Sequence, residues 1–94
     1  TSKIIMDVLA HYYNVSVTEI LSNRRNNDIT IPRQIAMYLC RYIINMTFPK
    51  IGEDFGGKEH TTVMHACNKV TVDLSSANSV FSQDIEEIKK RLSS

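Results

Sequence analysis

Apolar residues in this chain recur at intervals of three and four, and no stretch alternates apolar and polar residues as a half-buried strand would. After residue 59, for example, Val63, Ala66, Cys67 and Val70 fall on one face of a helix. The spacing predicts an all-α fold of about six helices. They are expected near residues 3–13, just after residue 16, from 32 to about 46, near 49–55, near 59–73 and from 81 to 92.

The expected helix boundaries rest on capping and turn residues. Ser16 and Glu19 have the spacing of a capping box, which predicts the start of a short second helix. The run 23–28, rich in Asn and Asp, favours a turn, and Pro32 fits the first position of a long helix. The apolar stripe of that helix is expected to comprise Ile35, Leu39, Ile43 and Met46.

Residues 49–70 have the outline of a helix-turn-helix: a short helix opened by Pro49, a turn at Gly56 and Gly57, and a longer helix. The first turn of that longer helix carries Glu59, His60 and Thr61. A carboxylate, an imidazole and a hydroxyl at this position are side chains that can reach base edges in the major groove. Taken alone, this outline also fits a helical protein-interaction module, and the two interpretations stay open at this point.

The charge distribution bears on that choice. The formal net charge is only +1, which by itself argues against a nucleic-acid partner. Basic residues nevertheless outnumber acids between 24 and 50, whereas acids gather near the C-terminal end. A basic face can therefore form despite the small net charge, and Lys50 is expected to meet a phosphate there.

Other sites are poorly supported. The run Gly52 to Lys58 resembles a P-loop, but Glu59 replaces the hydroxyl residue that would hold Mg²⁺. His60 and His65 are five residues apart and fall on different helix faces, so no metal site is expected. The isolated Cys40 and Cys67 are expected to be buried thiols in a reducing, cytoplasmic setting. No catalytic constellation is present, and we expect no enzyme activity.

Residues 51–70, IGEDFGGKEHTTVMHACNKV, closely resemble the signature of the C-terminal DNA-binding domain (domain IV) of the bacterial replication initiator DnaA family. The resemblance extends through 21–25, 32–37 and the ending 91–94, and so covers nearly the whole chain. It implies a Trp-repressor-like helical domain that binds double-stranded DNA at the DnaA box of the replication origin. Residues 1–94 would then be one domain, the C-terminal fragment of a larger initiator.

The resemblance also implies site residues. The acidic-His-Thr triplet that reads the major groove maps onto Glu59, His60 and Thr61. The apolar pair that contacts thymine methyls maps onto Phe48 and Pro49. The Arg of the minor groove maps onto Arg25. Phosphate contacts map onto Arg33, Gln34, Arg41 and Thr62.

The chain departs from the family pattern in three ways. Glu59 stands where Asp is usual, Phe48 stands where Leu is common, and residues 26–28 are less basic than the family's loop. The remaining expectations are an isolated monomer near the nucleoid, without a membrane span or a small-molecule substrate. No cofactor is expected in these residues, because the ATPase of a DnaA-like parent would lie in an upstream domain.

Overall fold

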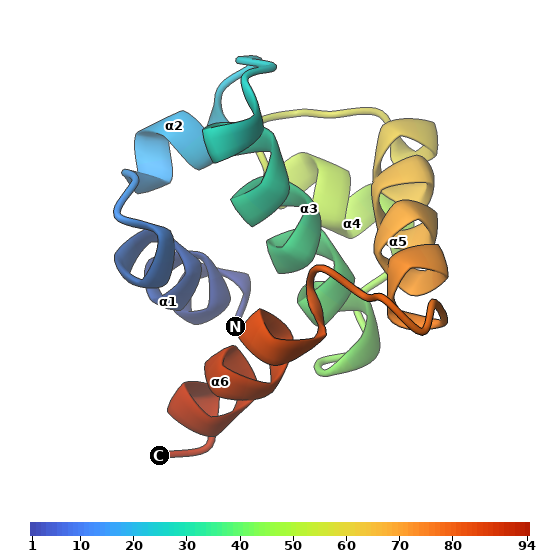
Figure 1. The fold of residues 1–94 in the computed structure, drawn as a ribbon. Coiled ribbons are helices and arrows are strands. Elements are labelled where there is room, and N and C mark those ends of the chain that lie inside the picture. Colours follow the sequence, from blue (N-terminus) through green and yellow to red (C-terminus); the bar gives the residue numbers. More distant parts are fainter.

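The computed structural model describes residues 1–94 as six helices with no strand, which confirms the all-α prediction (Figure 1). None of the helices is both long and apolar enough to cross a membrane. The helices are α1 (Ser2–Tyr13), α2 (Val17–Leu21), α3 (Asn27–Tyr42), α4 (Phe48–Asp54), α5 (His60–Leu74) and α6 (Ser82–Leu92).

Helix α3 runs through the middle of the molecule (Figure 1). It packs against α1 on one side and α5 on the other, while α4 packs on α5 and α6 on α1. The core comprises buried apolar side chains from all of these helices, among them Leu9, Leu39, Phe55, Val63 and Ile88. Because α3 and α5 pack together in this core, their buried contacts hold the two helices in one position relative to each other.

The capping box predicted for α2 is present. The Glu19 amide donates to Ser16 Oγ and the Ser16 amide donates to Glu19 Oε1, both at 3.0 Å. These bonds satisfy two amide donors that a helix start leaves unpaired, and they explain why a helix of only five residues has a defined first residue.

The predicted start of α3 was wrong. The helix begins at Asn27, five residues before Pro32, because the Asn26 carbonyl accepts the amides of Ile29 and Thr30, each at 2.9 Å. Pro32 therefore lies inside the helix, where its φ is compatible with helical geometry and its cost is one missing backbone hydrogen bond. Asp28 in the first turn favours the early start by its charge.

The predicted end of α3 was also too late. The helix ends at Tyr42, Asn45 adopts φ 56°, and the Met46 amide donates to the Cys40 carbonyl at 3.1 Å. The chain thus turns before the predicted stripe is complete. Ile43 is 45% exposed rather than in the core, and Met46 is only half-buried.

Helix α6 is fastened to α1 by a polar contact as well as by Ile85 and Ile88. The hydroxyls of Tyr12 and Tyr13 donate to the two carboxylate oxygens of Asp84, each at 2.8 Å. This pairing ties the C-terminal helix to α1, the helix on the other side of α3 from α5.

Candidate nucleic-acid interface

The turn between α4 and α5 depends on glycine. The Gly52 carbonyl accepts the amides of Gly57 (3.0 Å) and Lys58 (2.8 Å), which folds the chain back after α4. A Cβ added to Gly52 would lie 2.1 Å from the Lys58 carbonyl oxygen. Gly56 has φ 88°, in the left-handed region anticipated from the sequence. α4 and α5 thereby form the predicted helix-turn-helix.

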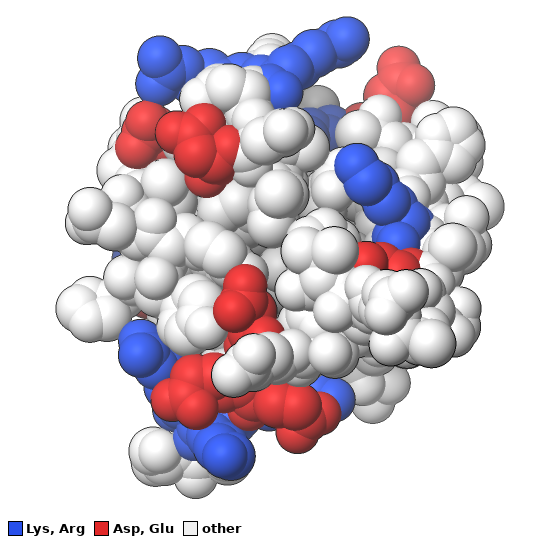
Figure 2. Space-filling model, viewed as in Figure 1, with Lys and Arg blue, Asp and Glu red and all other residues white.

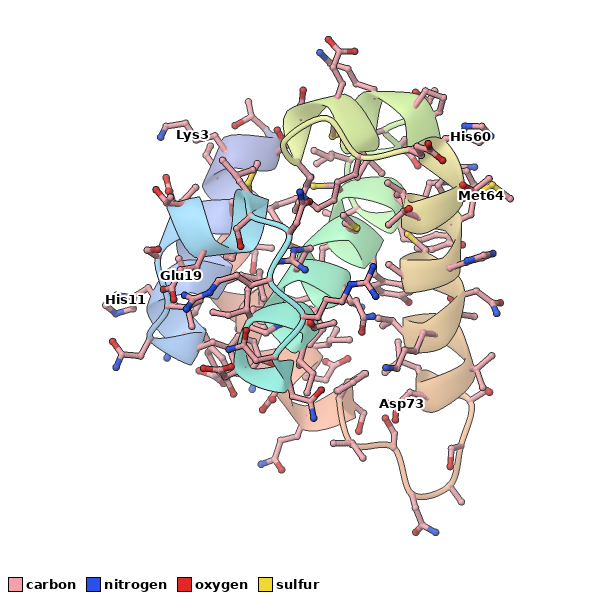
Figure 3. The ribbon with its side chains drawn as sticks, turned by 90° about the horizontal axis from the view of Figure 1, so that it is seen from above. Lys3, His11, Glu19, His60, Met64 and Asp73 are labelled. Carbon is pink, nitrogen blue, oxygen red and sulfur yellow. The ribbon has the colours of Figure 1, made fainter.

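Helix α5 separates a buried face from an exposed one. The four apolar residues noted in the sequence are all buried, including both Val63 and Val70 at 0% exposure. His60 begins the helix, Glu59 is its N-cap residue, and neither they nor Thr61 are covered. Figure 3 shows His60 and Met64 projecting outward from α5, away from the body of the molecule. The structure therefore brings the three expected base-reading side chains together at one exposed helix end.

Phe48 and Pro49 open α4 beside this end of the molecule. The Thr47 side chain caps the helix by accepting from the Lys50 amide at 3.3 Å. The Arg41 guanidinium lies over the Phe48 ring, 4.5 Å from its centroid, and donates to the Met46 carbonyl at 3.0 Å. Phe48 also borders a cavity of about 360 Å³ whose other walls include Met64 and Asn68 of α5. The expected apolar contact thus lies next to the exposed face of α5.

A basic pocket of about 430 Å³ lies between α3 and α5. Its lining includes four Arg and Lys residues and no carboxylate. Thr30 Oγ1 and the Gln34 side-chain oxygen, both in its wall, are buried without a hydrogen-bond partner. The pocket therefore offers an anion positive charge and the unused hydroxyl donor of Thr30, whereas the Gln34 oxygen can only accept. Its lining residues are Arg25, Thr30, Arg33, Gln34, Met37, Lys58, Thr62, His65, Ala66 and Lys69.

Three of the expected phosphate contacts, Arg33, Gln34 and Thr62, line this pocket, but Lys58, His65 and Lys69 were missed. A signal was available: Thr62, His65 and Lys69 lie at i, i+3 and i+7 on one face of the predicted helix.

Arg33 is more buried than a surface contact would be, at 8% exposure. Nε donates to the Ile20 carbonyl (2.7 Å), Nη1 to that of Arg24 (2.9 Å) and Nη2 to that of Glu19 (3.2 Å). Burial lowers the pKa of its guanidinium, which no carboxylate compensates. Arg33 therefore supplies charge to the pocket while its donors hold the chain around α2.

Lys58 has a similar arrangement. Its Nζ donates to the carbonyls of Leu21 (2.9 Å) and Phe55 (2.8 Å). Burial, and then the positive charge of Arg33, lowers the pKa of the Lys58 ammonium. Two neighbouring cations are thus held by carbonyl oxygens alone, which leaves the positive potential of the pocket unneutralised.

The remaining expected residues differ in how free they are. Lys50 pairs with Asp54 (3.3 Å) and Glu53 (3.7 Å), and its hydrogen bond to Asp54 raises the pKa of the ammonium. Arg24 pairs with Glu19 at 3.1 Å, whereas Arg25 is exposed and makes no hydrogen bond or ion pair. Figure 2 shows basic side chains over the loop between α2 and α3, and mixed charges over α6.

Residues 2–70 match the family described as "Bacterial dnaA protein helix-turn-helix". The chain belongs to this DnaA family. It is also similar to a solved structure titled "Crystal structure of DNA replication initiation factor", with 34% sequence identity and a TM-score of 0.84. That similarity covers 96% of this chain and 27% of the solved chain.

Membership in the DnaA helix-turn-helix family confirms the resemblance inferred from residues 51–70. The family is a non-catalytic, DNA-binding one, in line with the expectation that these residues form a binding module and not an enzyme. The pocket between α3 and α5 lies within the matched residues, so it is part of the DnaA domain and not an addition to it.

Proposed function

We propose that the chain binds double-stranded DNA sequence-specifically at the replication origin, by recognising the DnaA box. In this proposal α5 enters the major groove and Arg25 enters the adjoining minor groove. The observation that carries it is the pocket between α3 and α5, where four cations and no carboxylate lie beside the exposed start of α5. A DNA backbone is the polyanion that such a surface fits best, because its phosphates are evenly spaced and fully charged.

The base-reading end of the interface is the start of α5. The Glu59 carboxylate can accept from a cytosine amino group, and the Thr61 side chain can offer a hydroxyl and a methyl. His60, between these two residues in the sequence, projects outward from the start of α5 (Figure 3). Phe48 and Pro49 supply apolar surface for thymine methyls, with Phe48 oriented by the guanidinium of Arg41 above its ring.

The phosphate-binding end is the basic pocket. Lys69 and Thr62 approach it from α5, while Thr30 and Gln34 approach it from α3. The Thr30 hydroxyl has no protein partner, and donation to a phosphate would satisfy it. Gln34 would instead donate through its side-chain NH2, because its unpaired oxygen can only accept. Lys50 requires a different step, because a phosphate has to replace its contacts with Asp54 and Glu53.

Binding to a DnaA-box duplex and to a scrambled duplex of equal composition tests the proposal, with Lys69→Ala compared against Lys89→Ala. Lys69 lines the pocket, whereas Lys89 lies on α6, which packs on α1. Lys69→Ala should weaken binding to both duplexes and make the negative slope of log K against log salt shallower by about 0.9. Lys89→Ala should change neither. Equal effects of the two variants would contradict the proposed face, and absence of saturable binding would favour a protein-interaction module instead.

A further inference from the structure

The loop that carries Arg25 is joined to the helix-turn-helix at the C-terminal end of α2. The last carbonyls of a helix have no partner within it, and α2 has only five residues. Here the Ile20 carbonyl accepts from Arg33 on α3, and the Leu21 carbonyl accepts from Lys58 in the turn before α5. The end of α2 is therefore bonded to α3 on one side of the basic pocket and to the turn before α5 on the other.

The backbone itself makes a close approach at the same place. A Cβ added to Gly56 would lie 2.5 Å from the Leu21 carbonyl oxygen, so the turn between α4 and α5 rests directly on the end of α2. A third bond reaches the loop after α2, where Arg33 Nη1 donates to the Arg24 carbonyl at 2.9 Å. That carbonyl belongs to the peptide unit that leads into Arg25, so the backbone of Arg25 is anchored although its side chain is free.

We propose that Arg33 and Lys58 are positioning residues, which fix the spacing between Arg25 and the start of α5. This inference rests on the proposed roles of Arg25 in the minor groove and α5 in the major groove. Without these bonds, the loop 22–26 would be a polar connection with few contacts of its own, and Arg25 could adapt to many positions. With them, the two DNA-reading elements move as one body. Binding then depends on the distance between the minor-groove segment contacted by Arg25 and the major-groove segment contacted by α5, as well as on their sequences.

A base-pair insertion tests this on the unmodified protein. One extra pair between the A·T segment read by Arg25 and the segment read by α5 shifts the former by about 3.4 Å and about 35°. A fixed spacing predicts that the inserted duplex binds as weakly as Arg25→Ala binds the normal duplex. Arg25→Ala should then have no further effect on the inserted one. An inserted duplex that binds normally and is still weakened by Arg25→Ala would overturn the proposal, because the loop would then be adapting.

A double-mutant comparison tests the positioning role of Lys58. Arg25→Ala should weaken wild-type binding about tenfold, as loss of one base contact does. In a Lys58→Met background the same change should cost only about two- to threefold, and Lys58→Arg should restore the full factor. Lys69→Met is the matched control, since Lys69 lines the same pocket but makes no bond to α2. Lys69→Met should lower the affinity for DNA, but the fold-loss that Arg25→Ala causes should be the same in this background as in wild type.

If Arg25→Ala weakens binding as much in the Lys58→Met background as in wild type, the positioning role of Lys58 is overturned while the DNA-binding function stays intact. An Arg25→Ala variant with no effect in wild type would instead refute the minor-groove role, and the positioning proposal with it. These two failures are distinguishable because the second appears without any change at Lys58. If Lys58→Met loses its helical circular dichroism, the insertion series on wild type still tests the fixed spacing, and normal binding of the inserted duplex would still overturn the proposal.

Discussion

Gly52→Ala is a sharp test of the helix-turn-helix geometry because local preference and tertiary contact predict opposite signs. Gly52 lies within α4, where alanine is favoured over glycine by about 1 kcal/mol. The added Cβ, however, would lie 2.1 Å from the Lys58 carbonyl oxygen and 3.6 Å from Val63 Cγ2. The neighbour is backbone, so the turn itself has to move.

The magnitude follows from these contacts. Overpacking of this kind costs about 1–3 kcal/mol, and moving the turn weakens the two hydrogen bonds to the Gly52 carbonyl, at about 1 kcal/mol each. After the gain in helix preference, we expect Gly52→Ala to lower the free energy of unfolding by about 2–4 kcal/mol. For a domain of this size the melting temperature should fall by about 10–25 °C.

Urea unfolding followed by circular dichroism at 222 nm measures this change. Gly57→Ala is the matched control, because its φ is 79° but no atom lies within 4 Å of the added Cβ. Its cost should be the conformational one alone, about 1–2 kcal/mol. A Gly52→Ala variant as stable as wild type, or more stable than Gly57→Ala, would refute the close packing of α4 on the turn.

Three further outcomes follow from the interface. His60→Ala should cost about 1–3 kcal/mol on a DnaA-box duplex and little on random DNA; an equal loss on both would make His60 a phosphate contact or a structural residue. Arg33→Ala should lower the melting temperature as well as all DNA binding, because three carbonyls lose their donor; unchanged unfolding in urea would contradict its burial. Replacing a contacted thymine by deoxyuridine removes only a methyl, so it should weaken wild type and leave Phe48→Ala unaffected; the same loss in both would exclude Phe48 as the contact.

Much of the fold could be predicted from the sequence because its signals are local. The apolar spacing of α5 and the Ser16–Glu19 capping box depend on residues within one or two turns, and both predictions were confirmed. The start of α3 was wrong for a related reason. Pro32 was given more weight than the Asn26 carbonyl, whose amide partners start the helix a turn and a half earlier.

The interface was harder to predict because its contacts join distant parts of the chain. Lys58 bonds to a carbonyl 37 residues away, and Arg33 bonds to carbonyls 9 to 14 residues away. Carbonyl oxygens exist at every residue, so no side-chain pattern indicates which ones a cation will meet. The sequence therefore indicated that Arg33 was basic and near the site, but not that it was buried. The roles assigned to Glu59, His60 and Arg25 on DNA stay predictions.

The salt dependence of binding tests the central claim most directly, namely that the face between α3 and α5 is occupied by DNA backbone. Fluorescence anisotropy with a DnaA-box duplex, repeated at several salt concentrations, gives the slope of log K against log salt. Three cations of the pocket, Arg33, Lys58 and Lys69, are left to neutralise phosphates once Arg25 is assigned to the minor groove. At about 0.9 per neutralised phosphate they predict a slope of roughly −3. The preference over a scrambled duplex should persist at every salt concentration, because base contacts release few ions. A slope near zero, or equal affinity for the two duplexes, would contradict the account.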